Sequence, residues 1–352
     1  MNEAWENQNI EDQIVAAELG GTISDAVVWS DGALPTARLS EFAASVRAGL
    51  SSPRKFLSSM YLYDSIGSIL FEAICQLREY KCTVGEKRNL RRIGSQLCDA
   101  VPGLGRIIEL GGGSGEKAAI LLASVHNRMG NEIVFHNIDI SAKALEFSQA
   151  TIAGLPGVTF VPHRNDFENG LAEALSMRKG SEQVVVLFLG SSIGNFDREK
   201  ATSLLKAIRN MLRPGDHLLL GTDLVKDRER LVNAYDDPQG VTAAFNMNIL
   251  ARINFELGAN FNLRQFRHEA RWVTQGDKRV EMHLVSTTSQ RVHIPGAGLT
   301  IDFNRGESIL TEKSHKYTAD EIAQWAAEVG FSLTQQWIDD QSLFADNLLK
   351  AT

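Results

Sequence analysis

The chain has 352 residues, of which 43% are hydrophobic and 22% charged, which is enough for one large α/β domain with an elaboration or for two domains. Its formal net charge of −7, without any basic stripe, argues against a nucleic-acid-binding surface. No run of about 18 apolar residues is present, so we expect no membrane partner either.

The first third of the chain is predicted to be an arm followed by helices. Residues 1–35 are assigned to an N-terminal arm, and their polar, acidic start is unlike a signal peptide, which favours a cytoplasmic protein. From Leu39 to Gln96, apolar residues recur three and four apart, as in helices. The cysteines lack C-x-x-C spacing and are interpreted as reduced thiols rather than disulfides or metal ligands: Cys75, Cys82 and Cys98.

Beyond Pro102-Gly103, short apolar runs alternate with helical segments. Helical periodicity is present in Ala142–Ile152 and in Arg198–Leu212. The candidates for buried strands are Arg106–Leu110, Ile133–Ile140, Val158–Val161, Val184–Leu189 and His217–Thr222. This alternation predicts βαβ units with right-handed crossovers, and therefore an α/β fold with a parallel sheet.

The alternation ends after Asp223. A charged helix at Lys226–Tyr235 and a periodic helix at Val241–Leu257 precede segments with strand-like alternation: Arg267–Trp272, Arg279–Ser286 and Gln290–Ile294. We predict an inserted α+β subdomain over 226–304, and a main domain made of 36–225 and 305–352. The last part contains a possible strand at Glu307–Ser314, a capping-box helix start at Thr318–Glu321 and two closing strands at Leu333–Asp339 and Leu343–Leu349.

The segment after the first predicted strand, ELGGGSGEK, contains four glycines within five residues and leads directly into a helix-forming segment, Glu116–Val125. A strand, a glycine turn and a helix bring bare backbone N–H groups against a nucleotide-like ligand. Gly111, Gly113 and Gly115 form G-x-G-x-G, whereas a dinucleotide site needs a glycine where Glu116 stands. With Glu109 leading in, this favours S-adenosylmethionine over NAD, although a tight turn without a ligand is the structural alternative.

Acidic and aromatic residues follow the next two strands. Asp139 ends the second strand, where an acid can accept both ribose hydroxyls of a nucleoside, or cap the following helix, a role that Ser141 could fill instead. Asp166 and Phe167 follow the third strand, where an adenine could meet a hydrogen bond and an aromatic face. A simple loop turn explains Asp166 and Phe167 at least as well when they are considered alone.

The fourth strand leads into GSSIGNF, residues 190–196, at the edge of the sheet where α/β folds bind substrates. Gly190 would allow a substrate to approach the backbone closely, and the Asn195 amide could orient a polar nucleophile. The alternative is a strand-to-helix turn with Asn195 in a left-handed conformation. Tyr235 could equally mark a helix end, and Met282 could be an ordinary core residue.

The order of these motifs resembles a known family. The segments that carry the resemblance are YDSIGSILFEAI, LREY, ELGGGSGEK, NDF, LFLGSSIGNF, TDLVKD, GVTAAFNMNIL, RVEMHL and ILTEKSHKYT, together with the strand-end Asp139. They are similar to the histidine-specific Nα-methyltransferases of the ergothioneine pathway, a family that includes fungal enzymes acting on tryptophan derivatives. The resemblance covers about residues 55 to 350. It implies a Rossmann-like S-adenosylmethionine-dependent methyltransferase sheet with an inserted α+β substrate-binding subdomain.

The resemblance also implies roles for individual residues. S-adenosylmethionine would be held by Gly111, Lys117, Asp139, Asp166 and Phe167, beside Glu109, Gly113 and Gly115 of the glycine motif. An amino-acid substrate would be fixed at its α-amino and α-carboxylate groups by Tyr80, Asn195 and Tyr235, and its side chain lined by Tyr63, Met282, Glu312 and Ser314. The sequence departs from the family at Lys81–Val84, after Tyr80, which affects the loop over the substrate.

Chemistry and resemblance together predict methyl transfer to the α-amine of a free amino acid, most simply L-histidine. Glu312 could pair with an imidazole or guanidinium group, or form a surface salt bridge with Lys313 or Lys316. Asn195 and Tyr235 would position the amine, and small groups such as Gly190 would tolerate growing methyls. Three alternatives stay open: another amino acid such as arginine or a tryptophan derivative, an NAD-dependent oxidoreductase, and a catalytically silent S-adenosylmethionine-binding protein. We expect no obligate protein partner.

Overall fold

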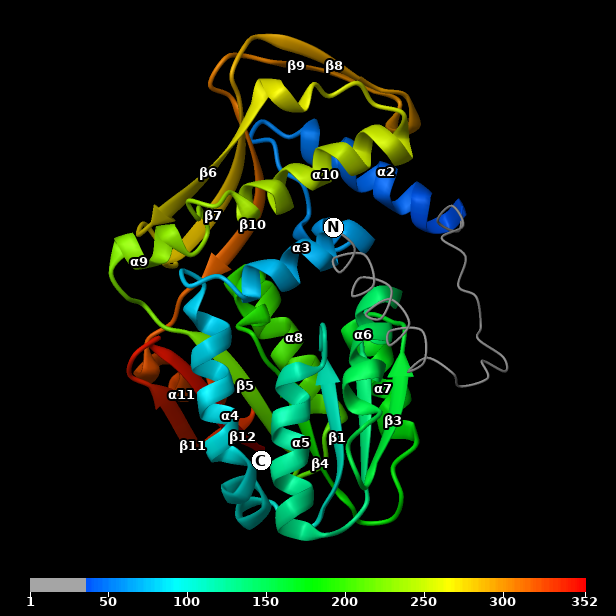
Figure 1. Ribbon diagram of the computed structural model, residues 1–352, viewed down its shortest axis with the longest axis vertical. Coiled ribbons are helices and arrows are strands. Elements are labelled where there is room, and N and C mark those ends of the chain that lie inside the picture. Colours follow the sequence, from blue (N-terminus) through cyan, green and yellow to red (C-terminus); the bar gives the residue numbers. More distant parts are fainter. Residues whose placement is uncertain (1–35) are drawn as a thin grey trace, which may run out of the picture. The chain divides into compact units, whose positions relative to one another are not determined.

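The structure of the protein is a computed structural model that describes residues 36–352 (Figure 1). The predicted N-terminal arm, residues 1–35, lies outside the described residues. The first described element is helix α2 (Thr36–Leu50), and the fold set out below is that of residues 41–352, which form one compact unit. No helix in the described part of the chain has the length and apolar character needed to cross a bilayer.

A seven-stranded sheet forms the centre of the main domain. Its strand order is β11-β12-β5-β4-β1-β2-β3, and β1 to β5 run parallel, as the sequence predicts. Strand β12 pairs antiparallel with both β5 and β11. The strands are β1 (Leu104–Leu110), β2 (Ile133–Ile138), β3 (Val158–His163), β4 (Gln183–Phe188), β5 (His217–Asp223), β11 (Phe331–Asp339) and β12 (Phe344–Ala351).

Helices cover both faces of this sheet, which confirms the α/β prediction. Adjacent residues of β1 belong to different cores, because Ile107 packs with α4 and α5 whereas Ile108 packs with α7, α8 and α11. Burial on two faces explains why these strands are nearly continuous apolar runs. The helices are α4 (Lys81–Ala100), α5 (Glu116–Met129), α6 (Ala142–Ile152), α7 (Phe167–Ser176), α8 (Arg198–Met211) and α11 (Ala319–Glu328).

The strand order reverses between β1 and β4. From β1 the chain continues outward to β2 and β3, and β4 then returns to the opposite side of β1. In open parallel sheets the crevice at the carboxyl ends of such neighbouring strands is the place where ligands bind. The predicted glycine motif follows β1 and Gly190 follows β4, so both lie at this crevice.

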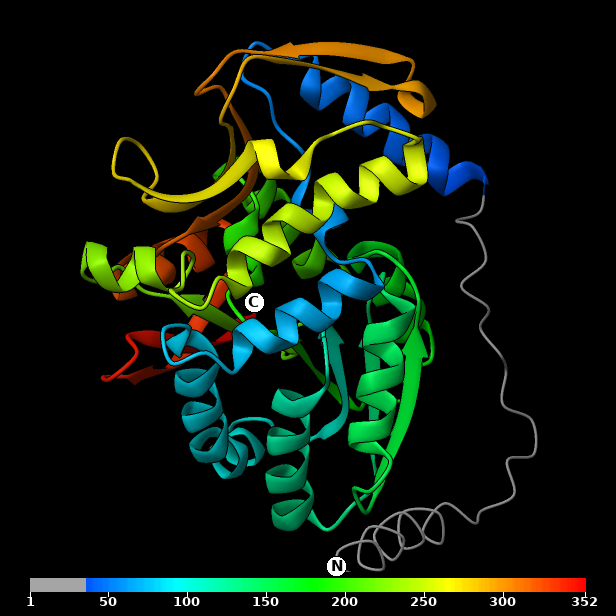
Figure 2. The ribbon, with the colours of Figure 1, turned by 45° about the horizontal axis from the view of Figure 1, so that its top comes forward.

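A second, antiparallel sheet has the order β10-β7-β6, and β8 pairs with β9 in a separate ribbon. Helix α10 packs against α3 and against β6 and β7, and Figure 2 shows its course beside α3. The elements are α3 (Ser65–Cys75), α9 (Arg228–Asn233), α10 (Val241–Leu257), β6 (Phe266–Val273), β7 (Arg279–Ser286), β8 (Gln290–Ile294), β9 (Leu299–Phe303) and β10 (Ser308–His315).

Strand β10 corrects the predicted boundary of the insertion. The sequence predicts a subdomain that ends at 304 and a main domain that includes 305–352, but β10 pairs with β7 and completes the small sheet. The chain returns to the main sheet only at Tyr317, which forms a bridge with Leu224. Apolar alternation predicts a strand here, yet it carries no information about which sheet the strand joins. The capping box at Thr318 and Glu321 is present as predicted.

Candidate active site

The glycine motif forms a tight turn between β1 and α5. Gly111, Gly113 and Gly115 have φ values of +71°, +54° and +75°, in the left-handed region where side chains are strained. Gly112 is constrained differently, because a Cβ placed on it would lie 2.5 Å from Oε2 of Glu109. Glycine is therefore required at three positions by the left-handed backbone, and at Gly112 by the close approach of the Glu109 side chain.

Glu109 lies beneath this turn and is 1% exposed. Its Oε2 atom has no hydrogen-bond partner among the described residues. Burial raises the pKa of the Glu109 carboxyl to about 8, although the nearby Lys117 ammonium acts in the opposite direction. A buried polar atom without a partner is costly, so this position suits a ligand that donates a hydrogen bond.

Asp139 follows β2 and is hydrogen-bonded to the backbone around it. Its Oδ1 accepts the Ser141 N–H at 2.8 Å, and the Gly113 N–H also donates to the carboxylate. Burial raises the Asp139 pKa to about 6, and these backbone donors partly offset that effect. Ser141 caps α6, with its hydroxyl accepting the Ala144 N–H, so Asp139 is not the cap of α6.

Asp166 and Phe167 lie differently with respect to the glycine turn. The Phe167 ring is in contact distance, with its Cζ 3.4 Å from a Cβ placed on Gly111. Asp166 is the N-cap of α7, and its two oxygens accept from the Asn169 N–H at 2.8 Å and from Asn169 Nδ2 at 2.7 Å. The Asp166 carboxylate thus caps its own helix, which differs from the loop turn given as the alternative.

Glu86 is a further buried residue at the crevice that the sequence analysis did not identify. It lies in α4 without solvent exposure, accepts the Gly190 N–H at 2.7 Å and forms an ion pair with Lys117 at 3.0 Å. The Lys117 Nζ atom lies 2.9 Å from a Cβ placed on Gly190, whose φ is +73°. The ends of β1 and β4 are therefore joined through Glu86, for which the sequence offers no motif.

The loop after β4 packs against the small sheet. It contains a short 3₁₀ turn, Ser192–Asn195, and Gly194 O accepts a hydrogen bond from His315 Nδ1 at 2.8 Å. Asn195 is half-buried beside this contact. Among the described non-glycine residues, positive φ occurs at Ser191 and Leu343, so the predicted left-handed alternative for Asn195 was wrong and Ser191 takes that conformation.

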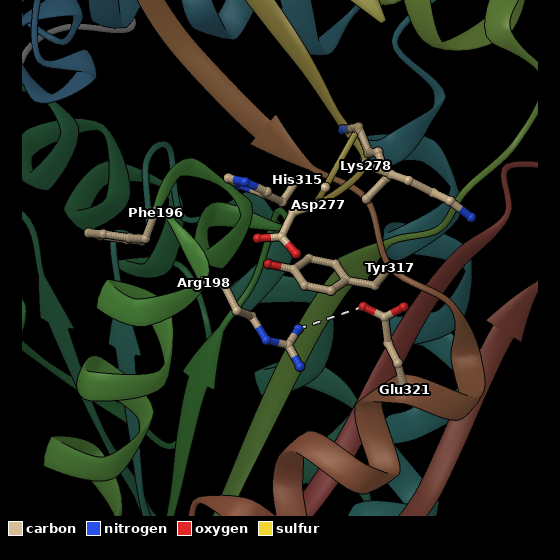
Figure 3. A pocket seen from close by; sticks show the side chains of 9 residues that line it. Phe196, Arg198, Asp277, Lys278, His315, Tyr317 and Glu321 are labelled. Carbon is tan, nitrogen blue, oxygen red and sulfur yellow. Dashed lines mark ion pairs between the residues drawn. The ribbon is translucent and has the colours of Figure 1, made fainter. Parts of the chain in front are cut away.

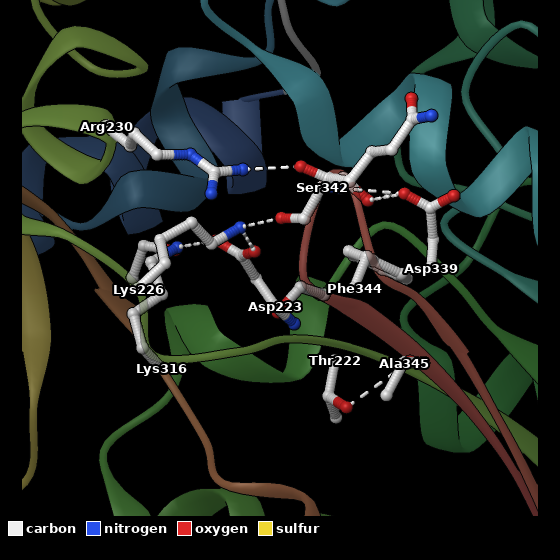
Figure 4. A network of polar contacts seen from close by, with 12 residues as sticks. Thr222, Asp223, Lys226, Arg230, Lys316, Asp339, Ser342, Phe344 and Ala345 are labelled. Atoms are coloured by element: carbon white, nitrogen blue, oxygen red, sulfur yellow. Dashed lines mark hydrogen bonds and ion pairs between the residues drawn. The ribbon is translucent and has the colours of Figure 1, made fainter.

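Tyr235, Ser314 and Lys316 form a hydrogen-bonded cluster on the other side of the crevice. The Tyr235 hydroxyl donates to Ser314 Oγ at 2.7 Å, and Lys316 Nζ donates to both hydroxyl oxygens, at 2.8 and 2.9 Å. The Tyr80 ring packs edge-on against Tyr235 with 6.2 Å between centroids. Figure 4 shows Lys316 beside Asp223, the last residue of β5, which joins this cluster to the main sheet.

Glu312 is a second buried carboxylate with a partnerless oxygen. It is 8% exposed, its Oε2 has no hydrogen-bond partner among the described residues, and burial raises its pKa to about 7. The predicted surface salt bridge is absent, because Lys313 pairs with Asp197 at 2.6 Å and Lys316 with Asp223 at 2.8 Å. Met282 lies opposite Glu312 in the sheet register.

An aromatic group lies next to Glu312. The Tyr63 ring contacts Phe71 and Phe245 edge-on, at 5.4 and 5.5 Å between centroids. Burial raises the Tyr63 pKa well above its ordinary value, and the Glu312 charge adds to the shift. Tyr63, Tyr235 and Glu312 therefore influence one another electrostatically although they come from widely separated parts of the sequence. Of the predicted substrate residues, the structure brings Tyr80, Tyr235 and Ser314 into contact and pairs Met282 with Glu312.

Two hollows border this region. Figure 3 shows the first, of about 150 Å³, in which Arg198 and Glu321 approach to 3.6 Å. Its walls are Phe196, Arg198, Gly276, Asp277, Lys278, His315, Lys316, Tyr317 and Glu321, and none of the predicted site residues is among them. The second includes Asp166 and Phe167 and continues along α8.

Comparison with known proteins gives concordant matches. Residues 42–351 match the family model described as histidine-specific methyltransferase, SAM-dependent. Histidine N-alpha-methyltransferases of Mycolicibacterium smegmatis and Mycobacterium tuberculosis are each 39% identical, over 86% of this chain and 92% of their own. Ergothioneine biosynthesis protein 1 of Neurospora crassa is 28% identical over 81% of this chain and 32% of its own length.

Proposed function

The chain belongs to the family of histidine-specific, S-adenosylmethionine-dependent methyltransferases, and from this premise we propose that it transfers methyl groups to the α-amine of L-histidine, up to the trimethyl product. The observation that supports histidine as the substrate is Glu312, a buried carboxylate with a partnerless oxygen, two residues before Ser314 on β10. A ring N–H of histidine is a donor that would satisfy this oxygen.

The glycine turn and its surroundings fit an adenosyl cofactor. Gly111 lies against the Phe167 ring, Glu109 offers a free buried acceptor, and Asp139 stands at the end of β2. Bound S-adenosylmethionine supplies a methyl group already activated by its sulfonium. We propose that the residues holding it are Glu109, Gly111, Gly113, Gly115, Lys117, Asp139, Asp166 and Phe167. Asp166 is the weakest member of this set, because its carboxylate also caps α7.

The amino acid is proposed to bind across the crevice from the glycine turn. Asn195 and Tyr235 would orient its α-amino and α-carboxylate groups, and Glu312 and Ser314 would receive its side chain. The complete proposed set is Tyr63, Tyr80, Gly190, Asn195, Tyr235, Met282, Glu312 and Ser314. Gly190 leaves room where a side chain would meet Lys117, and this supports repeated methylation of one nitrogen.

Catalysis in this proposal depends on orientation and desolvation. Asn195 and Tyr235 hold the amine in line with the methyl group, so that a bimolecular displacement becomes effectively intramolecular. A free α-amine is mostly protonated near neutral pH, and burial in the crevice lowers its pKa so that the ammonium releases its proton to water before methyl transfer. The residues contacting the amine are an amide and a phenol, which position the nucleophile without forming a covalent bond.

Mass spectrometry of the twenty amino acids incubated with the enzyme and S-adenosylmethionine tests the proposal. We expect histidine alone to gain one, two or three methyl groups. Methylation of arginine or tryptophan alone would replace histidine as the substrate. Methylation of none would favour a silent binding protein, and a failure to bind labelled S-adenosylmethionine would contradict the proposed cofactor site.

We also propose that the enzyme works in the cytoplasm on a free small-molecule substrate. The three cysteines are free thiols, which is usual in a reducing compartment. An acidic protein of net charge −7 is also a poor partner for nucleic acid. Fractionation of the native host cells, with the enzyme followed by antibody, tests the location; recovery in a secreted or membrane fraction would contradict it.

A further inference from the structure

Lys316 is a fully buried lysine with no role in the site proposed above. Its side chain has no solvent exposure, and Nζ has three close partners. It forms an ion pair with Asp223 at 2.8 Å and donates to Tyr235 OH at 2.8 Å and to Ser314 Oγ at 2.9 Å. An ammonium group has three hydrogens, so each of them is directed to one of these partners.

The ammonium keeps its charge in this position. Burial alone would lower the pKa of Lys316, but the Asp223 carboxylate reverses the effect and holds the pKa above the ordinary lysine value. Asp223 has a second cationic partner in Lys226, which also donates to Ser342 O at 2.5 Å (Figure 4). Lys316 is therefore a permanent donor, and it accepts no hydrogen bond.

This donor determines the direction of the hydrogen bond that Ser314 can make. Ser314 Oγ accepts from Lys316 and also from the Tyr235 hydroxyl, at 2.9 and 2.7 Å. A serine hydroxyl has two acceptor lone pairs and one hydrogen. Both lone pairs are occupied, so the only hydrogen-bonding capacity left to Ser314 is donation through its own O–H.

Glu312 and Ser314 are two residues apart on β10, so their side chains point to the same face of the sheet. Glu312 presents a buried acceptor there, and Ser314, which accepts from Lys316 and Tyr235, retains its own O–H as a donor. We propose that Lys316 is a specificity-determining positioning residue, which forces Ser314 to donate and so makes the pocket select a side chain with one donor and one acceptor. This inference rests on the proposed function, because it assumes that Glu312 and Ser314 receive the substrate side chain.

A neutral imidazole is the amino-acid side chain that matches this pattern, since one ring nitrogen donates and the other accepts. A guanidinium carries donors only and would meet the Ser314 hydrogen with another hydrogen. An indole carries one donor and would leave the Ser314 hydrogen without an acceptor in a buried site. Leaving a buried hydroxyl unsatisfied lowers binding by about tenfold or more.

The test compares histidine with pyrrolylalanine, whose ring has nearly the same size and keeps an N–H but lacks the second ring nitrogen. Both ring isomers are assayed, and the better one is used. The wild-type enzyme is expected to favour histidine by about tenfold or more in kcat/KM. In Lys316→Met the Tyr235 hydroxyl no longer accepts a hydrogen bond from Lys316, so it can accept the Ser314 hydrogen instead, and we expect the preference to fall severalfold.

Lys313→Met is the matched control. Lys313 lies between Glu312 and Ser314 on β10 but forms its ion pair with the exposed Asp197, so its loss should leave the preference unchanged. The dissociation constant of S-adenosylhomocysteine checks that each variant retains its fold. If Lys316→Met does not fold, Asp223→Asn/Lys226→Met/Lys316→Met removes all three buried charges together and serves in its place.

The preference is also measured in Ser314→Ala, alone and combined with Lys316→Met. Lys316 acts through Ser314 in this proposal, so its substitution should have no further effect on the preference once Ser314 is absent. The role of Lys316 would be overturned by an unchanged preference in Lys316→Met, or by an equal effect of this substitution with and without Ser314. Either result would leave the proposed function intact. A wild-type enzyme that methylates amino acids but not histidine would overturn the proposed function itself.

Discussion

The cofactor side and the acceptor side of the crevice are built on different principles. On the cofactor side, the glycine turn, Asp139 and Phe167 follow three consecutive parallel strands and lie within 111–167. On the acceptor side, Tyr63, Tyr235 and Glu312 come from positions that span most of the chain and meet through a second sheet. In the proposed function, cofactor binding is thus a property of the common sheet edge, whereas substrate choice depends on elements added to it.

Asp139 on the cofactor side and Glu312 on the acceptor side differ in their hydrogen bonding. The backbone N–H groups of Gly113 and Ser141 donate hydrogen bonds to the Asp139 carboxylate, so the protein itself supplies its donors. Glu312 has no equivalent donor at Oε2, and its pKa rises to about 7. Glu109 on the cofactor side also has a partnerless oxygen, and we propose that the cofactor completes Glu109 and the substrate side chain completes Glu312. The following substitutions test whether the two sides act separately.

Asn195→Ala is expected to have the largest effect, because it removes orientation of the nucleophile at the junction between the two sides. We expect kcat to fall by a factor of about ten to a thousand, with cofactor affinity within about threefold of wild type. Single-turnover methylation measures the first quantity and titration with S-adenosylhomocysteine the second. Near-normal turnover would remove Asn195 from its proposed role.

Asp139→Asn is expected to act on the cofactor side alone. Replacing a carboxylate that accepts ribose hydroxyls should weaken S-adenosylmethionine binding by about tenfold to a hundredfold. The KM for histidine, measured at saturating cofactor, should stay close to that of wild type. A parallel loss of histidine affinity would contradict the separation of the two sides.

Glu312→Gln is the counterpart on the acceptor side. We expect the KM for histidine to rise about tenfold, with the cofactor dissociation constant unchanged. Because the Glu312 pKa is about 7, its carboxylate forms only as pH rises through that value. The ratio of wild-type to variant kcat/KM should therefore increase from about pH 6 to about pH 8. A ratio independent of pH would show that Glu312 does not titrate in catalysis.

Glu109→Gln is expected to have the smallest effect, a change in stability of the ligand-free enzyme. Burial raises the pKa of the Glu109 carboxyl in the folded state to about 8. Its contribution to stability is therefore fully present at pH values below the pKa of the unfolded state, and it is lost as pH rises through 8. The variant cannot ionise, so its Tm should exceed that of wild type by about 2–4 °C above pH 8 and match it in acid. Differential scanning calorimetry across pH measures this, and a constant Tm difference would contradict the assignment.

Much of the cofactor side could be predicted from the sequence, because its signals are local. The glycines require left-handed backbone wherever they occur, and Asp139 follows a strand that a short apolar run identifies. Asp166 shows the limit of this reasoning, since a strand-end acid and a helix cap have the same sequence pattern. Glu86 was missed for a related reason: its partners Gly190 and Lys117 are distant in sequence, and no spacing indicates them.

The sequence by itself determined the alternation of strands and helices, the glycine turn and the family, because each depends on short-range patterns or on motif order. The tertiary structure alone decided that β10 joins the small sheet, that Lys316 pairs with Asp223 rather than with Glu312, and that the Glu312 oxygen stays free. The physical reason is that pairing of charges and hydrogen-bond direction depend on which atoms lie within about 3 Å, and distant segments meet only when the chain folds.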